Sequence, residues 1–433
     1  AAGQARATAQ VRNVTSFAGV EAGPRVAWLC MRGDLELKAG DQYGPFEIVD
    51  LLGEGGFAKV YRVRGPGLPN DGALKLSRLP VYDGPEAQRT LREVEILRTL
   101  TNPHVVRIYN AGRTHDERVF ILMEFLEGMQ LDVFHDFDQP MPAAQAVWVI
   151  HQACLGLAEA HAHGVVHRDI KPENLWVEPD HNVKVIDFGL ARAFNEGSAM
   201  GTNVTMGHFL IGTPHYSQPE QLHTQTLTPA SDVYSLGTIL YELLSGHCVF
   251  FENMRTSQIR ESFRDNPVMW IEAHARREPV SLHRHAHCRD VPASLAELVF
   301  RCLEKDPLLR PRSAGDLSTA LGEIMHYDLG MAMGATVRII HPYGGYEDRL
   351  IFPGSHRIGS SSECEIRLPS AGIAPLHAVL DWAGLPEYPH LRPLRADGTV
   401  RVSGKPIERS QALGPHDVVQ VGNYELALEY PTV

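Results

Sequence analysis

Apolar and polar residues alternate from residue 43 onward in a pattern that predicts a β-sheet. The stretch F-E-I-V-D-L-L at residues 46–52 alternates as a strand does, and a second apolar strand is expected around residues 73–75. A helix with one apolar face is then indicated by residues at helical spacing, Leu91, Val94, Leu97 and Leu100.

A longer amphipathic helix is predicted over residues 143–163, and it stops at Gly164, a typical helix terminator. Beyond residue 335 short alternating strands are separated by turn residues, which is typical of an all-β sandwich of about a hundred residues. A length of 433 residues also favours two domains. We therefore expect an α+β chain with a leader over 1–40, a mixed domain over 43–326, a linker over 327–335 and a β-sandwich over 336–433.

Composition narrows the classes of partner. The net charge of -12, from 52 acidic and 40 basic residues, disfavours binding to nucleic acid or anionic lipid. No apolar run approaches the roughly 20 residues needed to span a bilayer. Six scattered cysteines without a C-x-x-C pair fit a reducing cytosol. We expect a soluble cytoplasmic protein with no nucleic-acid partner and no membrane span.

The leader is rich in Ala, Gly and Arg, has no acidic residue before Glu21 and shows no clear periodicity. Disorder is the expected state of residues 1–40, with an organelle transit peptide as the alternative.

A glycine-rich string, G-E-G-G-F-A-K-V-Y, follows the first predicted strand and holds Gly53, Gly55 and Val60 at fixed spacing. Glycines let backbone amides approach phosphates closely, although glycine turns between strands are also common. Ala58 stands where such a loop usually has its third glycine.

Lys75 lies on an apolar strand, where burying a lysine costs free energy unless an anion and a carboxylate pair with it. Glu93, on the predicted helix, is the expected ion-pair partner, with Glu95 as the second choice. The alternative is a surface lysine whose charged end reaches solvent.

The string V-V-H-R-D-I-K-P-E-N-L at residues 165–175 is the most specific in the chain. Asp169 can accept the proton of an incoming hydroxyl, Lys171 can neutralise a transferring phosphoryl group, and Asn174 can hold a magnesium ion. Asp187 follows in V-I-D-F-G-L, where an acid at a strand end can hold Mg²⁺, or alternatively Mn²⁺, against phosphates.

In this order and spacing the motifs resemble the eukaryotic-type protein kinase family, and specifically its bacterial serine/threonine branch, over residues 43–326. The resemblance implies a bilobal kinase fold and transfer of the ATP γ-phosphoryl group to Ser or Thr of protein substrates. It also implies nucleotide contacts at Gly53, Gly55, Val60, Ala73, Lys75, Glu124, Leu126 and Trp176.

Structural roles follow from the same resemblance. Glu220 is expected to pair with Arg310, and Asp232 to anchor the catalytic loop. Lys171 and Thr213 together resemble serine/threonine rather than tyrosine kinases.

Regulation is expected at Arg168, which in relatives with this motif meets a phosphate on the activation loop. Thr205 is the preferred site of autophosphorylation, and Thr202 and Ser198 are the next candidates. The alternative is that these hydroxyls only solvate a loop.

Trp176 stands where the family usually places a medium aliphatic side chain under the adenine. A tight or blocked nucleotide site would make the chain a pseudokinase scaffold, which is the alternative to an active enzyme.

Histidines are dense between residues 274 and 288, where zinc binding through His283, His285, His287 and Cys288 is conceivable. The spacing suits tetrahedral geometry badly and favours a solvated loop.

The C-terminal strings, among them R-I-G-S-S-S-E-C-E-I-R-L, resemble the forkhead-associated (FHA) family, whose members commonly bind phosphothreonine. Ser360 occupies the place of that family's phosphate-binding arginine, residues 374–375 are Ala-Pro in place of Ser-Arg, and Asp397 replaces an asparagine.

A site that has lost hydrogen-bond donors and gained a carboxylate binds phosphate poorly, so a degenerate FHA-like module is expected. It would dock a protein partner or the chain's own kinase domain. His377 is retained as a structural histidine, and His356 with Arg357 could supply a displaced anion site.

Overall fold

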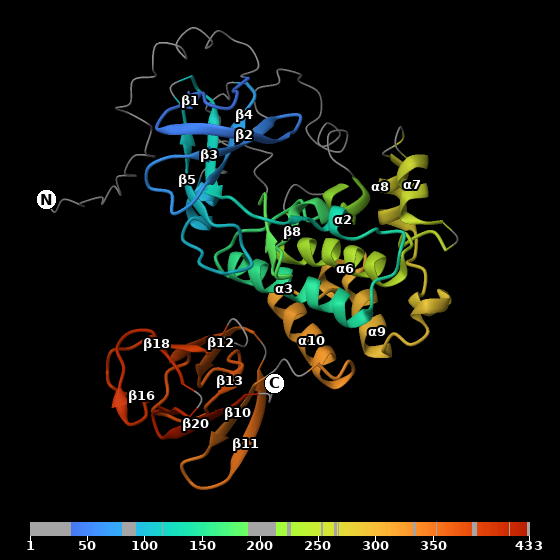
Figure 1. Ribbon diagram of the computed structural model, residues 1–433. Helices are drawn as coiled ribbons and strands as arrows, with labels where there is room; N and C mark the ends of the chain where they lie inside the picture. Colours follow the sequence, from blue (N-terminus) through green and yellow to red (C-terminus); the bar gives the residue numbers. More distant parts are fainter. Residues whose placement is uncertain are drawn as a thin grey trace, which may run out of the picture. The chain divides into compact units, whose positions relative to one another are not determined.

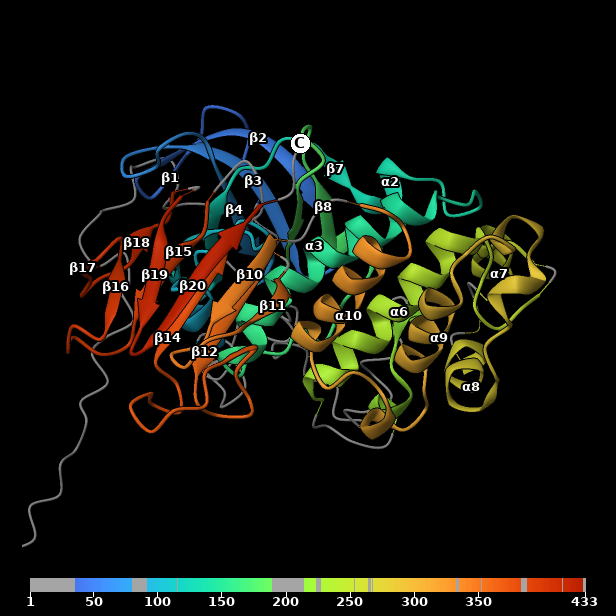
Figure 2. The same ribbon diagram turned by 90° about the horizontal axis from the view of Figure 1, so that it is seen from below.

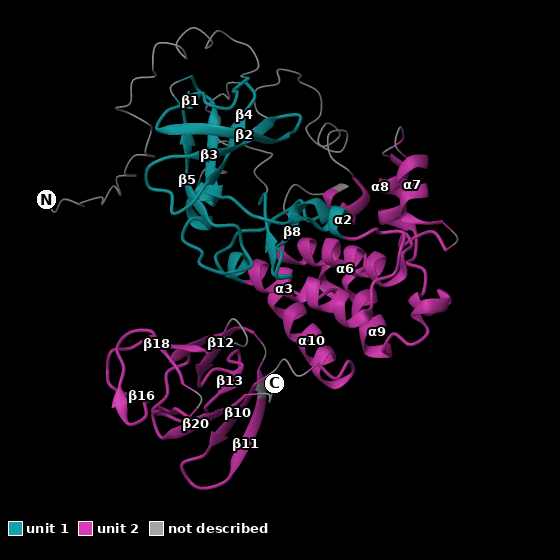
Figure 3. Cartoon of the chain, in the orientation of Figure 1, with its two compact units in different colours: residues 1–134, 159–212 teal, residues 135–158, 213–433 magenta. Residues whose placement is uncertain are grey.

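The computed structural model describes residues 36–79, 92–114, 116–188, 214–222, 227–252, 254–263, 266, 268–331, 335–351, 353–382, 388–414 and 416–430. The chain divides into two compact units, Ala1–Phe134 with Glu159–Gly212, and His135–Ala158 with Thr213–Val433 (Figure 3).

The first unit contains a six-stranded antiparallel sheet with the order β1-β2-β3-β4-β6-β5 (Figure 1). Its strands are β1 Gln42–Tyr43, β2 Phe46–Glu54, β3 Ala58–Arg64, β4 Gly72–Ser77, β5 Ile108–Arg113 and β6 Val119–Glu124. Buried Tyr61, Leu74 and Phe120 pack on one side of it. Leu37 is buried in the same cluster, so the packed chain begins before the leader boundary expected at residue 40.

A helix at residues 92–97 carries the predicted apolar stripe, with Val94 and Leu97 buried. Leu91 lies outside the described residues. A small sheet of β7 Met129–Gln130, β8 Leu175–Val177 and β9 Val183–Val185 follows, next to α2 Leu131–Phe134. Val185 also bridges to Val105, which fixes the start of the segment that carries Asp187.

The second unit contains one almost fully buried helix, α6 Pro229–Ser245, which packs against α9 Ala293–Cys302 and α10 Ala314–Tyr327. The other helices are α7 Thr256–Ser262 and α8 Val268–Arg276, together with most of α3, Ala143–Ala162. Residues on all sides of α6 are buried, as expected for a helix at the centre of a core. Gly237 of α6 allows close contact with Cys302 of α9, because a Cβ at Gly237 would lie 2.4 Å from the Cβ of Cys302.

The C-terminal part forms the β-sandwich that the alternating pattern predicted. One sheet has the order β11-β10-β20-β19-β16-β17 and the other β13-β12-β14-β15-β18, and Figure 2 shows β10, β20, β19 and β16 running side by side. The strands are β10 Ala335–Ile340, β11 Tyr346–Ile351, β12 Gly354–Gly359, β13 Ile366–Arg367, β14 Ala378–Trp382, β15 His390–Pro393, β16 Val400–Val402, β17 Lys405–Pro406, β18 Gln411–Ala412, β19 Val418–Val421 and β20 Tyr424–Glu429.

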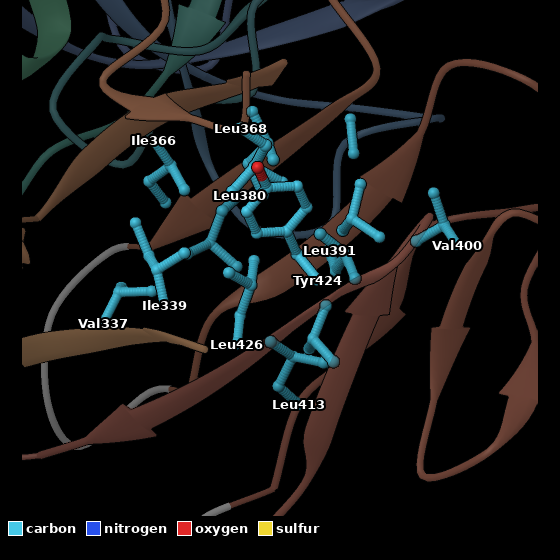
Figure 4. Close-up of a cluster of buried hydrophobic side chains, with 14 of the residues drawn as sticks. Val337, Ile339, Ile366, Leu368, Leu380, Leu391, Val400, Leu413, Tyr424 and Leu426 are labelled. Carbon is cyan, nitrogen blue, oxygen red and sulfur yellow. The ribbon is translucent and has the colours of Figure 1, made fainter. Parts of the chain in front are cut away.

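Side chains from both sheets meet in a single apolar core, where Ile339, Leu380, Leu391 and Leu426 point toward one another (Figure 4). The expected fold class, a mixed domain followed by a β-sandwich, is therefore confirmed. Within the described residues no helix is long and apolar enough to cross a membrane.

Candidate active site

The glycine-rich turn joins β2 to β3 in the first unit. Gly53 lies opposite Val60 in the strand register, and the backbone N–H of Gly55 donates to the carbonyl of Ala58 at 2.8 Å. A Cβ on Gly53 would meet no atom within 4 Å, and one on Gly55 would meet only the Ala58 carbonyl, at 3.6 Å. Since neither residue has a positive φ, the fold itself does not require glycine at these positions.

Lys75 of β4 forms an ion pair with Asp187, its Nζ lying 2.8 Å from Oδ2. The Lys75 side chain is 13% exposed, which excludes the alternative of a lysine reaching into solvent. Burial tends to raise the pKa of Asp187, but Lys75 outweighs burial, with smaller contributions from His167 and Lys171, and the pKa is lowered. The Asp187 carboxylate is therefore held in its ionised form.

Glu93 pairs with Arg168, and this corrects the predicted partner. Nη2 of Arg168 lies 3.0 Å from Oε1 of Glu93, and Nη1 lies 3.2 Å from Oε2. The planar guanidinium engages both carboxylate oxygens at once, whereas a lysine ammonium is a single point of charge. In this conformation Glu93 therefore faces Arg168, and Lys75 faces Asp187.

The catalytic-loop residues converge on Asp169. Nζ of Lys171 lies 3.0 Å from Oδ2 of Asp169. The side-chain amide of Asn174 donates to the Asp169 carbonyl at 2.7 Å and to Oδ2 at 3.2 Å. This arrangement arises because the short 3₁₀ helix η1, Pro172–Asn174, turns the chain back after Lys171. Burial lowers the pKa of Lys171, but Asp169, followed by Glu173 and Asp187, outweighs burial and raises it.

His167 joins the two acidic segments, a role that the sequence did not indicate. The carbonyl of Ile186 lies 2.8 Å from Nε2 of the buried His167 and, because a carbonyl can only accept, this nitrogen carries the proton. The imidazole also packs against Phe188, with ring centroids 4.7 Å apart. In addition, the backbone N–H of Ile186 donates to the carbonyl of Asn174 at 3.0 Å. Asp187 is thereby fixed next to the catalytic loop.

An apolar cluster lies beside these charged groups. Ala73, Val106 and Met123 are buried in it, and Val60, Leu126 and Ile186 are partly buried against it. Of the predicted nucleotide contacts, the structure thus brings Val60, Ala73 and Leu126 together. The Glu124 side chain is engaged elsewhere: its Oε1 lies 2.8 Å from Nζ of Lys184 and accepts from the backbone N–H of Arg107 at 2.8 Å.

Trp176 is held by its indole nitrogen. Nε1–H donates to the backbone carbonyl of Glu127 at 2.8 Å, and Trp176 pairs with Gln130 in the register of β7 and β8. The side chain is half-buried. This bond fixes the direction of the indole along the segment that follows β6.

The predicted pair of Glu220 and Arg310 is present in the second unit. Nη1 of Arg310 lies 2.8 Å from Oε1 of Glu220, and Nη2 lies 2.9 Å from Oε2. Arg310 also donates to the carbonyl of Ala230 and covers the ring of Tyr234. Asp232 is fully buried in α6, and its anchoring of the catalytic loop stays a prediction.

The β-sandwich places its own candidate residues at the ends of β12 and β14. Ser360 donates its hydroxyl to the carbonyl of Ile373 at 2.9 Å and its N–H to the carbonyl of Ala374 at 2.9 Å. The guanidinium of Arg357 is held by Glu365, at 2.8 Å from Nη2 and 3.2 Å from Nε.

His377 lies between two loops of this sandwich. Its Nδ1 accepts from the N–H of Ala374 at 3.1 Å, and its Nε2 lies 2.8 Å from Oγ1 of Thr399. Asp397 is engaged by the N–H and the hydroxyl of Thr399. These hydrogen bonds give His377 a structural position between residues 374 and 399.

The predicted phosphorylation sites Ser198, Thr202 and Thr205 lie outside the described residues, and so does Thr213.

Comparisons with known proteins agree with this geometry. Residues 46–320 match the model of the protein kinase domain, and residues 356–422 match that of the FHA domain. The chain is 34% identical over 282 residues to the serine/threonine-protein kinase PknB of Mycolicibacterium smegmatis. The aligned region covers 64% of this chain and 42% of that protein. The chain is also 33% identical over 274 residues to the serine/threonine-protein kinase pkn3 of Myxococcus xanthus, covering 62% and 48%.

The chain thus matches less than half the length of these curated relatives. A crystal structure of a double mutant of the PknI kinase domain of Mycobacterium tuberculosis is similar in fold, with a TM-score of 0.50 and 22% identity over 67% of this chain and 99% of that one. Because the kinase match spans more than half of the sequence and includes each motif described above, the chain belongs to the protein kinase family, with an FHA domain in its C-terminal part.

Proposed function

We propose that this chain is an active serine/threonine protein kinase that transfers the γ-phosphoryl group of ATP to protein Ser or Thr side chains. The observation that carries the proposal is the convergence of Lys75, Asp187, Asp169, Lys171 and Asn174 within one unit of the fold. Asn174 contacts Asp169, and Ile186, the neighbour of Asp187, donates to the carbonyl of Asn174. This set combines a base, two cations and oxygen donors, as phosphoryl transfer needs.

Asp169 has the role of receiving the proton of the substrate hydroxyl. Its carboxylate is oriented by Lys171 and Asn174, and 47% of its side chain is exposed, so a substrate hydroxyl has access to it. Lys171 remains protonated, since Asp169 helps to raise its pKa, and it supplies positive charge where the phosphoryl group moves.

The nucleotide would bind next to the glycine-rich turn and the apolar cluster. Gly53 and Gly55 are glycines that the fold does not require, which supports close approach of a ligand to their backbone. The apolar cluster around Ala73 and Met123 suits a planar base. Lys75, adjacent to Asp187, would neutralise the phosphates.

The oxygen atoms at this site also suit a divalent metal ion. Asp187 is ionised, and the amide nitrogen of Asn174 is directed to Asp169, so that its carbonyl oxygen is the remaining donor atom. Oxygen ligands of this kind are those that Mg²⁺ prefers, with Mn²⁺ as the alternative. A bound ion would neutralise charge on the phosphates during transfer.

For the FHA domain we propose docking of a protein partner, or of the chain's own kinase domain, without ordinary phosphothreonine recognition. Ser360 directs both its hydroxyl and its N–H to backbone carbonyls, and Arg357 is neutralised by Glu365. Asp397 adds a negative charge at the same end of the sandwich. A phosphate therefore finds few uncommitted donors there.

A cytoplasmic location is part of the proposal. Five of the six cysteines lie in the described part of the chain, and all five are free and buried thiols. Burial raises the pKa of Cys154, Cys288 and Cys302, which keeps these thiols protonated. Such cysteines suit a reducing compartment.

A radiolabelled-ATP assay tests the activity. The wild type should incorporate label into a general protein substrate, while Asp169→Asn should lose about a hundredfold or more, because the proton acceptor is removed. Asp180→Asn makes the same chemical change in an exposed turn of the same unit and should retain wild-type incorporation. No incorporation by the wild type would instead favour the pseudokinase scaffold.

Calorimetry with a phosphothreonine peptide library tests the FHA proposal. We expect no phosphate-dependent heat. Micromolar binding that disappears with the unphosphorylated peptides would overturn the proposed degeneracy.

A further inference from the structure

Three imidazoles gather at the C-terminal end of α6, and the proposed kinase activity does not use them. We call His247, His285 and His287 the imidazole cluster. The rings of His247 and His285 have centroids 4.4 Å apart, and the ring of His287 lies 6.1 Å from each of the others. His247 follows α6, whereas the other two belong to the segment of η4 Leu282–Arg284 and η5 Ala286–Cys288.

Two of these rings face the same atom. Nδ1 of His247 lies 2.8 Å from the carbonyl oxygen of Ser245, and Nε2 of His287 lies 2.5 Å from it. Ser245 is the last residue of α6. Because the carbonyl can only accept, both nitrogens carry their protons in this state. Two imidazole nitrogens and one carbonyl oxygen thus converge at a helix end that carries partial negative charge.

The cluster is accessible to a cation from solvent. His287 is exposed and His247 is half-buried, so an ion could approach from solvent. His285 is buried, and its Nε2 lies 3.0 Å from the hydroxyl of Tyr241.

We propose that His247 and His287, with the carbonyl of Ser245, form a binding site for a divalent first-row transition ion such as Zn²⁺ or Ni²⁺. Imidazole nitrogen is a preferred ligand of these ions and a poor one for Mg²⁺. On binding, the proton on Nδ1 of His247 moves to Nε2, and the proton on Nε2 of His287 moves to Nδ1. Both rings stay neutral, and no proton is released.

The structure selects this pair from a larger set. Of the four candidates in the histidine-rich segment, His283 is directed to the carbonyl of Val291 at 3.0 Å, and the thiol of Cys288 donates to Leu244 at 3.2 Å. These two are directed to other carbonyls, whereas His247, outside that segment, contacts the carbonyl of Ser245. The ion would join the end of α6 to the loop of residues 282–288.

A second group of potential ligands, His215, Glu242 and Cys248, is fully buried. Its His215 and Glu242 are already hydrogen bonded at 2.5 Å, and Arg260 lies 3.1 Å from the other nitrogen of His215. A guanidinium beside the ligands opposes a cation, and this group serves as a comparison in the test.

The test is a titration of the chelator-treated full chain with ZnCl₂, followed by calorimetry in excess MgCl₂ so that carboxylate sites are occupied. The wild type should show a single saturable site, and Zn²⁺ should raise its unfolding temperature. The double variant His247→Gln with His287→Gln keeps amide donors for the Ser245 carbonyl but should lose both effects. His283→Ala and Cys248→Ser should bind as the wild type does.

Each other outcome overturns the proposal. Unchanged Zn²⁺ binding by the double variant would place the ion elsewhere, and loss in Cys248→Ser would place it in the buried group. No saturable binding by the wild type would leave the imidazole cluster as a helix cap only. The measurement needs no phosphoryl transfer, so it stands whether or not the chain is an active kinase.

Discussion

Arg168 engages both carboxylate oxygens of Glu93, a residue 75 positions away in the sequence, and at the same time Lys75 engages Asp187. The two ion pairs belong to one unit of the fold. Glu93 cannot form its bidentate contact with Arg168 and also serve fully as the partner of Lys75. A phosphate that attracted Arg168 would therefore release Glu93 toward Lys75.

Replacing Arg168 removes this competition. In Arg168→Gln, Glu93 loses its competing partner and a phosphate loses its receptor, so catalytic efficiency should no longer respond to phosphatase treatment. The wild type should lose activity on the same treatment. The measurement is kcat/KM before and after dephosphorylation.

Arg98→Gln is the matched control, because Arg98 pairs with the exposed Glu95 one helical turn away at 2.9 Å. This variant should respond to phosphatase as the wild type does. An Arg168→Gln protein that still loses activity on dephosphorylation would contradict the competition.

The buried pair of Glu220 and Arg310 should matter for stability. Removing the carboxylate in Glu220→Ala leaves a guanidinium that is 3% exposed without its anion, and the free energy of unfolding should fall by about 3–5 kcal/mol. Urea denaturation measures the change. Asp316→Ala breaks the exposed pair with Arg312 and a hydrogen bond from the Arg312 N–H at the start of α10, and should cost no more than about 1 kcal/mol. A loss no larger than that of Asp316→Ala would show that the pair at Glu220 is dispensable.

Two glycines in helices should respond to alanine with opposite sign. In Gly237→Ala the new Cβ would lie 2.4 Å from the Cβ of Cys302, so α6 and α9 must separate at a cost of about 1–3 kcal/mol. In Gly315→Ala the new Cβ meets Oγ of Ser313 at 3.4 Å, and higher helix propensity should stabilise α10 by up to about 1 kcal/mol. Equal effects in thermal unfolding would refute the packing argument.

Acid should destabilise the first unit through His104. Burial is the main cause that lowers the pKa of His104 to about 4, while Nδ1 lies 3.0 Å from the carbonyl of Val183. His104 takes up a proton near pH 6.5 in the unfolded chain, but only near pH 4 in the folded chain. Stability is therefore lost as pH falls between these values, by up to roughly 3 kcal/mol.

His104→Asn keeps a donor for the Val183 carbonyl and removes the titration. Urea denaturation at pH 7 and pH 4.5 should give a smaller acid-induced loss for this variant than for the wild type. Equal losses in the two proteins would exclude His104 as the cause.

Local pattern was enough to predict much of the fold. The alternating strings in the last hundred residues correspond to β10, β14, β19 and β20, and the helix expected over 143–163 is Ala143–Ala162. Each of these elements carries its signal within its own residues, as apolar periodicity bounded by turn residues. Glu220 with Arg310 was likewise expected, but from family resemblance.

The partners of flexible charged groups were not predictable in this way. Glu93 and Arg168 are 75 residues apart in the sequence, and His247 and His287 are 40 residues apart. No local pattern encodes which of several nearby cations the Glu93 carboxylate will bind. That choice depends on distances of a few tenths of an ångström and on the two-pronged shape of guanidinium. The direction of the Trp176 indole also depended on a backbone carbonyl, at Glu127, which sequence does not reveal.

That bond between the indole of Trp176 and Glu127 gives the protein an optical reporter of its own. Of the tryptophans in the described part of the chain, Trp270 and Trp382 are buried and Trp148 is half-buried in the second unit, whereas Trp176, also half-buried, lies in the first. Its emission depends on the polarity around the ring, so a nucleotide bound beside it, as the proposed function expects, would register as a change in intrinsic fluorescence. Ligand affinity thus becomes measurable on the unlabelled chain, without a phosphoacceptor.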